Sequence, residues 1–182
     1  MVMVKLFSLE KTARCSIGSN TPAKSLELRH TIKLIGKLDV IIEDIECNIK
    51  LIVNEMNSPI ITIPGICYRM GAMILAEIGN ISRFDSPDKI LAYAGLSPPT
   101  YHSGQLTSPY SRMEKRDSHY LRYALFNATK FVCHWEPTFA TYLAKKRAEG
   151  KHYTVAVSHA TKKLVRLIYA LERSRQPFIS AT

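Results

Sequence analysis

The feature that most constrains this fold is a run of apolar residues between Ser25 and Met56 whose spacing alternates between three and four. Such steps keep side chains on one face of an α-helix and average close to the heptad of a coiled coil. The pattern predicts one long amphipathic helix over residues 25–57, with Ser25 as its N-cap and Pro59 beyond its end. The apolar positions are Leu28, Ile32, Ile35, Leu38, Ile42, Ile45, Ile49, Ile52 and Met56.

A helix of that length reaches roughly 45 Å, and a small domain does not cover the whole of its apolar stripe. We therefore expect residues 25–57 to pair with a second copy of the chain or with another part of a larger protein. Leu34, Ile41 and Val53 widen the stripe, so antiparallel packing within the chain is a second arrangement that fits the pattern.

The rest of the chain predicts an all-α fold, with a helical domain over residues 58–175, a polar tail over 176–182 and an unassigned segment over 1–24. Residues 61–63 fit either a strand or the end of a short helix. Apolar periodicity, helix-stopping glycines and prolines predict helices over residues 68–78, 87–93, 118–135, 138–149 and 154–174.

Composition narrows the class of protein. Hydrophobic residues make up 46% of the chain, enough to fill a core, and no apolar run is long enough to span a membrane. The first ten residues lack the features of a signal peptide. The 4 cysteines have no zinc-ligand spacing, which predicts reduced thiols, no metal site and a cytoplasmic protein.

Charge is the first indication of function. Residues 1–111 hold 11 Lys/Arg against 10 Asp/Glu, whereas residues 112–182 hold 14 against 5, a local excess of +9. A local basic excess favours a polyanionic partner, most simply nucleic acid, over a solvated face without a partner.

The turn Ile63-Pro64-Gly65-Ile66 lies between two helix-forming runs, as in a helix-hairpin-helix. In that motif the backbone N–H groups of the turn and the following helix N-terminus bind a DNA phosphate. Pro64, Gly65 and Ile66 are therefore candidate phosphate-binding residues. A purely structural hairpin fits the same residues equally well.

Ser103 lies in a segment rich in proline and glycine, between His102 and Gly104. A serine hydroxyl attacks phosphorus when a neighbouring group activates it, and Gly104 would allow a backbone to approach closely. Without other information, a Ser-Gly pair in a loop is an ordinary turn.

Basic residues precede and enter the helix expected over residues 118–135. Arg112, Lys115, Arg116 and Arg122, with His119 among them, are spaced to contact phosphates, which gives affinity without reading sequence. The alternative is an exposed helix start with no partner.

In order and spacing, these pieces resemble the C-terminal domain of the IS110/IS116/IS902 family of insertion-sequence transposases, over roughly residues 25–145. The residues that carry the resemblance are Ile63-Pro64-Gly65-Ile66, Leu75-Ala76-Glu77-Ile78-Gly79-Asn80, Arg83-Phe84, Leu91-Ala92-Tyr93-Ala94-Gly95-Leu96-Ser97-Pro98, Ser103-Gly104 and Leu121-Arg122-Tyr123-Ala124-Leu125.

The resemblance implies a DNA recombinase guided by a structured RNA, so the partners would be DNA and guide RNA. A loop serine, Ser103 by position, would attack the DNA phosphodiester and hold the strand as a phosphoserine. A separate N-terminal RNase-H-like domain with an acidic tetrad would bind Mg²⁺, so no cofactor is expected within this chain.

Three departures from the family pattern matter. Residues 1–24 match nothing in it, so we expect this chain to lack the RNase-H-like domain, and Glu114, Asp117 and Cys67 replace the family's usual small residues. We therefore expect a truncated transposase that does not cut DNA alone, and that pairs with itself or with an intact transposase through residues 25–57. The alternative is a non-catalytic helix-hairpin-helix protein that binds DNA or regulates the transposase.

Overall fold

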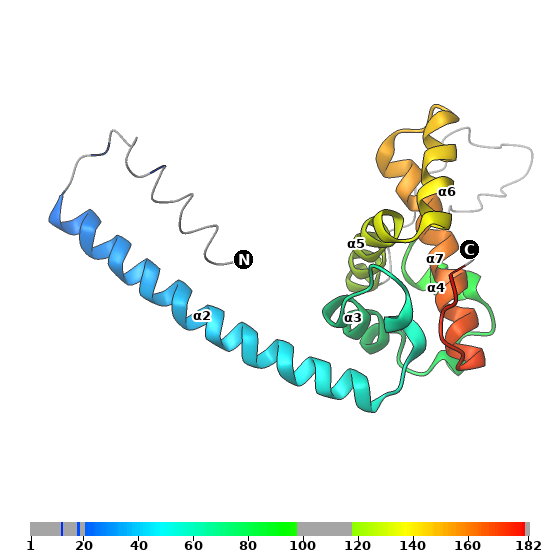
Figure 1. The fold of residues 1–182 in the computed structure, drawn as a ribbon, viewed down its shortest axis with the longest axis horizontal. Coiled ribbons are helices and arrows are strands. Elements are labelled where there is room, and N and C mark those ends of the chain that lie inside the picture. The colour runs from blue at the N-terminus through cyan, green and yellow to red at the C-terminus, as the bar shows by residue number, and fades with distance from the viewer. Residues whose placement is uncertain (1–11, 13–17, 19–20, 98–117, 181–182) are drawn as a thin grey trace, which may run out of the picture. The chain divides into compact units, whose positions relative to one another are not determined.

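The computed structural model describes residues 12, 18, 21–97 and 118–180, and every regular element in them is a helix (Figure 1). The expected all-α fold class is therefore confirmed. The chain divides into two compact units, residues 1–44 and 45–182. In the described residues, we find no helix long and apolar enough to cross a membrane.

The long helix α2 spans Pro22–Glu55 and crosses the boundary between the units. It begins earlier than predicted, because the Ser25 amide already donates an intrahelical hydrogen bond to the Thr21 carbonyl at 3.0 Å. The prediction of Ser25 as N-cap is wrong. A proline fits the first helical turn because the N–H that it lacks would have no intrahelical partner there.

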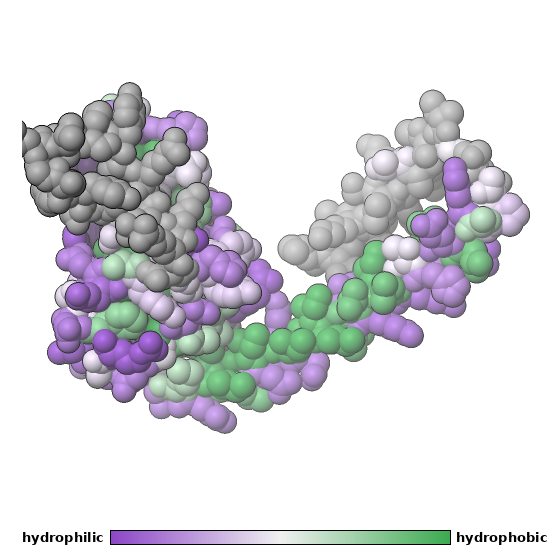
Figure 2. Space-filling model, turned by 180° about the vertical axis from the view of Figure 1, so that it is seen from behind, coloured by the Kyte–Doolittle hydropathy of each residue, from purple (hydrophilic) through white to green (hydrophobic). Residues whose placement is uncertain are grey.

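The apolar stripe of α2 divides between the two units. Within residues 22–44, its leucines and isoleucines are each about half exposed, for example Ile35 at 53% and Leu38 at 47%. Figure 2 shows apolar side chains gathered along one side of this helix and hydrophilic ones along the other. Within residues 45–55, Val53 is buried and Ile49 packs against the core.

The second unit is a helical domain in which α5 packs against α3, α6 and α7. Residues 61–63, for which a strand and a helix end were both open, follow or complete a short 3-10 helix. The elements after α2 are η1 Pro59–Thr62, α3 Tyr68–Ile78, η2 Ile81–Arg83, α4 Pro87–Tyr93, α5 His119–Trp135, α6 Pro137–Ala148 and α7 Tyr153–Ser174.

Helices α5 and α7 pack against each other, and both bury small side chains: Ala124 and Ala128 on α5, and Ala156 and Ala160 on α7. Larger residues such as Leu121, Leu125, Val132, Leu164 and Ile168 fill the core around them. Burial of such side chains contributes roughly 1.5–3 kcal/mol each.

Two buried carboxylates tie the end of the chain to the core. Glu172 accepts a hydrogen bond from the Ser58 hydroxyl and pairs with Arg175 at 3.4 Å. Glu136 accepts hydrogen bonds from Ser180 at 3.0 and 3.1 Å. The Phe178 amide donates to the Thr62 hydroxyl at 2.7 Å, and the Phe178 ring packs on the core. The described part of the expected polar tail is therefore anchored.

Candidate nucleic-acid interface

The turn at Pro64 and Gly65 lies against the C-terminal half of α5. Gly65 has φ +94°, and a Cβ atom built on it would lie 2.6 Å from the Phe131 carbonyl carbon and 2.6 Å from the Val132 nitrogen. Glycine is therefore required here by backbone conformation and by close approach to α5. The structure gives Gly65 a packing role that the sequence pattern alone did not indicate.

The remaining residues of the turn offer little free hydrogen-bonding capacity. The Ile66 amide donates to the Ile63 carbonyl at 3.1 Å, and both isoleucine side chains are buried. Pro64 has no N–H and is half-buried. A phosphate contact from Pro64, Gly65 or Ile66 stays a prediction, and Ile66 would have to give up its turn hydrogen bond to make one.

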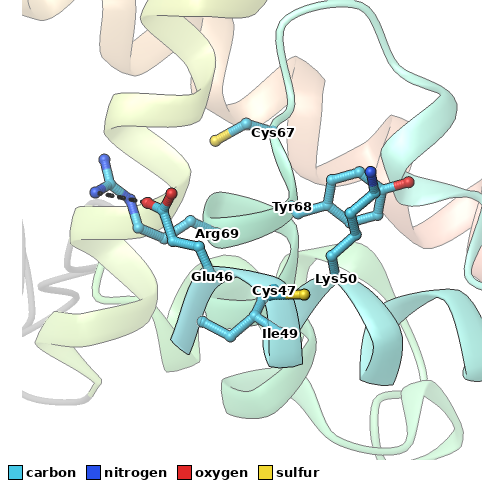
Figure 3. Close-up of a pocket in the computed structure, with 7 residues that line it drawn as sticks. All are labelled: Glu46, Cys47, Ile49, Lys50, Cys67, Tyr68 and Arg69. Atoms are coloured by element: carbon cyan, nitrogen blue, oxygen red, sulfur yellow. Dashed lines mark ion pairs between the residues drawn. The ribbon is translucent and has the colours of Figure 1, made fainter. Parts of the chain in front are cut away.

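The turn leads into the N-terminus of α3, which borders a pocket. Cys67 is the N-cap of α3 and makes no side-chain capping bond. The pocket is open to solvent, has a volume of about 480 Å³ and is lined by the start of α3 and the C-terminal part of α2 (Figure 3). Its lining residues are Glu46, Cys47, Ile49, Lys50, Cys67, Tyr68 and Arg69.

Charges of both signs surround this pocket. Arg69 lies 3.9 Å from Glu46 on one side, and the Lys50 ammonium lies 5.6 Å from the centre of the Tyr68 ring on the other (Figure 3). Both partners of the Arg69–Glu46 pair are more than half exposed, so its contribution to stability is small. Lys50 and Arg69 are cations beside the helix N-terminus, where backbone N–H groups favour an anion.

Arg122, predicted to contact phosphate, has an intramolecular partner. Its Nη1 donates to the Ala94 carbonyl oxygen at 2.9 Å, which joins α5 to the end of α4. Nearby, the Ser118 amide donates to the Tyr93 carbonyl at 3.0 Å, and the Ser118 hydroxyl donates to Glu77 at 2.6 Å. Arg122 thus has a structural role, and its phosphate contact stays a prediction.

The other predicted site residues lie outside the described residues. They are Ser103, the proposed nucleophile, and Gly104, Arg112, Lys115 and Arg116. The segment that contains them, residues 98–117, starts after the end of α4 and rejoins the described structure at Ser118, which is bonded to Tyr93 at the C-terminus of α4.

A cationic cluster that sequence reasoning did not single out lies near His159, around the junction of α6 and α7, and consists of Lys146, Lys151 and Lys162, the first two paired with Glu149. Residues 137–174 hold eight Lys/Arg against two Asp/Glu, an excess of +6. Burial lowers the pKa of His159, and the nearby charges of Lys151, Lys162 and Lys146 lower it further. The signal in the sequence is the run Lys145-Lys146-Arg147 in the last turn of α6, where cations also complement the helix dipole.

The Cys133 thiol lies in the core of the helical domain. Burial raises the pKa of the Cys133 thiol to about 11, so this cysteine is a poor nucleophile near neutral pH. Within the described ranges, we find no group of three or more His, Cys, Asp or Glu side chains that could hold a metal ion.

Comparison with known proteins identifies related chains. Residues 57–144 match the transposase family IS116/IS110/IS902. A 42 kDa protein of insertion element IS900 from Mycobacterium paratuberculosis is 30% identical over 124 residues, which is 68% of this chain and 31% of that protein. The pilin gene-inverting protein of Moraxella bovis is 31% identical over 153 residues, 83% of this chain and 47% of that protein.

A third relative, the 43.6 kDa protein of insertion element IS110 from Streptomyces coelicolor, is 30% identical over 118 residues, 64% of this chain and 29% of that protein. The chain thus spans less than half the length of these curated relatives. The family match runs from η1 through α5 into the first two turns of α6, and the similarity to the Moraxella protein extends over more of the chain.

Proposed function

Through residues 57–144 this chain belongs to the IS116/IS110/IS902 family of transposases, and we propose that it binds DNA and takes part in transposition or a related DNA rearrangement. The family match is the observation that carries the proposal. Relatives that carry the names of insertion elements and of a gene-inverting protein point to the same class of reaction. Because the DNA of a bacterial cell lies in the cytoplasm, action on DNA implies that the protein works there.

Electrostatics supports DNA binding independently of the family. The excess of +9 in residues 112–182 includes the cluster at the junction of α6 and α7. Cations that neutralise phosphates release condensed counterions, so affinity falls steeply with salt. We propose that Lys151 and Lys162 contact the phosphates of a duplex.

Fluorescence anisotropy of a labelled duplex, measured over a range of salt concentrations, tests this step. Replacement of Lys151 and Lys162 by Gln should reduce the slope of log affinity against log salt by about one for each lost contact. The matched control removes two charges elsewhere, with Lys33→Gln and Lys37→Gln in α2. Equal slopes for the two double variants would exclude the α6–α7 junction as the DNA contact.

The chemistry that we propose centres on Ser103. Its hydroxyl would lose a proton as Oγ attacks the phosphorus of a DNA phosphodiester, the bond to the leaving deoxyribose oxygen would break, and that oxygen would take up a proton in exchange. The resulting phosphoserine keeps the energy of the original ester, so a second hydroxyl can rejoin the strand. Mg²⁺ held by an acidic RNase-H-like domain would neutralise charge on the phosphorus during this step.

The adduct assay uses end-labelled DNA, Mg²⁺ and an RNase-H-like domain supplied as a separate polypeptide. A labelled band that resists denaturant should form with the natural chain and disappear with Ser103→Ala. Ser108→Ala, in the same segment, is the matched control and should leave the band unchanged. DNA binding without an adduct in any combination would favour the alternative of a non-catalytic DNA-binding or regulatory protein.

Two further partners complete the proposal. The half-exposed aliphatic residues of α2 favour pairing of residues 25–57 with a second copy or with another transposase chain, because such a surface is costly to leave in water. A structured guide RNA would add the sequence information that phosphate contacts lack. Recombination that requires the RNA, with a target that changes when the RNA changes, would support this part.

A further inference from the structure

Helix α5 carries four exposed aromatic side chains along one side, between the middle of its solvent face and the border of its buried face. Tyr120 is 59% exposed, Tyr123 58%, Phe131 53% and Trp135 64%. At the 3.6-residue period the four rings lie within an arc of roughly 120°, with Tyr123 near the middle of the solvent face and Trp135 at the border with the buried face. We call these four residues the aromatic row, which extends over about 22 Å at 1.5 Å per residue.

Large aromatic rings in water are costly, and nothing in the hydrogen-bonding of α5 requires them there. The buried face already has its complete set of apolar residues, among them Leu121, Leu125 and Val132. A row of four rings on one helix face therefore points to a partner that contacts it.

The chemistry around the row identifies the class of partner. Helix α5 contains no Asp or Glu, and Lys130 is its cation on the solvent side, since Arg122 is bonded to the Ala94 carbonyl. Lys130 is exposed, with its ammonium 4.9 Å from the centre of the neighbouring Phe126 ring, and the imidazole of His134 lies 5.0 Å from the Trp135 ring, measured between ring centres. Rings interleaved with cations suit nucleic acid whose bases are unpaired, because every base has a face that stacks and every phosphate is negative.

A protein partner would favour a different surface. The solvent face of α5 shows no Leu, Ile or Val, whereas the exposed face of α2, where we expect a helix to dock, is built from them. The row also adjoins the turn at Gly65, which lies against the backbone of Phe131 and Val132. A single strand of nucleic acid bound along the row would thus continue past the predicted phosphate-binding turn.

We propose that the aromatic row of α5 is a stacking platform for single-stranded nucleic acid, on which unpaired bases stack on Tyr123, Phe131 and Trp135 while Lys130 contacts the phosphates. The proposal deepens the nucleic-acid binding proposed above and rests on it. Stacking reads no particular sequence, so the platform would hold any unpaired segment that forms during strand exchange or in a structured RNA.

The 182-residue chain contains a single tryptophan, Trp135, which makes the test direct. A base stacked on its indole should quench the fluorescence. The titration uses oligothymidine of about twenty nucleotides and, in parallel, a duplex of the same length. Oligothymidine should quench Trp135 in a saturable way, and Phe131→Ala or Tyr123→Ala should each weaken its binding by about five- to one hundred-fold.

Three comparisons separate stacking from a general loss of fold or charge. Tyr123→Phe keeps the ring and should bind like the natural chain. Tyr153→Ala removes an aromatic residue that is 43% exposed on α7, outside the row, and should also bind normally. Duplex affinity should change less than two-fold in Phe131→Ala, and circular dichroism should show an unchanged helix content.

Each contrary result has a distinct meaning. Duplex binding without quenching, and with unchanged oligothymidine affinity in Phe131→Ala and Tyr123→Ala, overturns the platform and leaves the proposed DNA binding standing. Failure to bind either nucleic acid overturns both. If these variants bind normally but sediment as smaller assemblies, the row is a protein interface and the platform is wrong.

Discussion

Replacement of Gly65 by alanine tests whether this glycine is required by packing against α5. At φ +94° an alanine is strained, which costs roughly 1–2 kcal/mol. Its Cβ would also lie 2.6–2.7 Å from backbone atoms of Phe131 and Val132. Backbone cannot turn aside as a flexible side chain does, so overpacking adds roughly 1–3 kcal/mol. We expect a total loss of about 2–5 kcal/mol.

Gly150 provides the matched control. It has a similar positive φ of +78°, but a Cβ there meets nothing within 4 Å. Gly150→Ala therefore reports the backbone strain alone, about 1–2 kcal/mol. The difference between the two variants isolates the collision with α5, which we expect to be about 1–3 kcal/mol.

Urea unfolding followed by circular dichroism measures both losses. In thermal scans, a domain of this size shifts by roughly 4 °C per kcal/mol, so Tm should fall by about 8–20 °C for Gly65→Ala and about 4–8 °C for Gly150→Ala. Equal losses would refute the packing argument. An unchanged stability of Gly65→Ala with weaker DNA binding would instead show that the glycine serves only a phosphate contact.

Three further changes have defined outcomes. Leu38→Glu puts a charge on the exposed stripe of α2 and should convert an oligomer to a monomer in sedimentation equilibrium. Ser58→Ala removes the hydroxyl that donates to the buried Glu172 and should lower the free energy of unfolding by about 1–3 kcal/mol in urea. The free energy of unfolding should fall as pH rises from 9.0 towards about 11, because the Cys133 thiol loses its proton at a lower pH in the unfolded chain than in the folded one. Cys133→Ser should flatten this part of the pH profile.

Each of these three tests has a control at a residue that carries the same change or the same group. Lys37→Glu alters charge at a position outside the heptad seam and should leave the assembly intact. Ser82→Ala removes an exposed serine and should change stability by less than about 0.5 kcal/mol. Cys47 is exposed and should react with a thiol reagent at pH 8 well before the buried Cys133 does. An equal reaction rate for the two thiols would contradict the burial of Cys133.

Local signals made most of the helices predictable. Pro87 and Pro137 stand at the starts of α4 and α6, Gly79 caps α3, and the Ser118 hydroxyl accepts from the Leu121 amide at the start of α5. Each signal acts within about one helical turn, so sequence alone reveals it. The start of α2 was misplaced because Pro22, three residues before Ser25, already fits a first helical turn.

Contacts between distant residues were not predictable in the same way. Gly65 was identified as a special residue, but its reason lies in the backbone at Phe131, which no local pattern relates to residue 65. The anchoring of Phe178 to Thr62 is another such contact. The local excess of positive charge was visible in the sequence, whereas its concentration around His159 depends on how α6 and α7 pack.

The two roles considered for the turn, phosphate binding and packing, predict different effects of a negative charge at Cys67 on DNA affinity. Cys67 is exposed, has an extended backbone and makes no capping bond at the N-terminus of α3. Cys67→Asp supplies a good N-cap and favourable charge at the positive end of the helix, so stability should rise by about 0.5–1 kcal/mol. The same carboxylate would repel a phosphate bound at this turn. If the turn contacts DNA, duplex affinity falls while stability rises, whereas Cys67→Ser raises stability without that loss. If the affinity of Cys67→Asp for the duplex is unchanged, the turn does not contact DNA and serves packing alone.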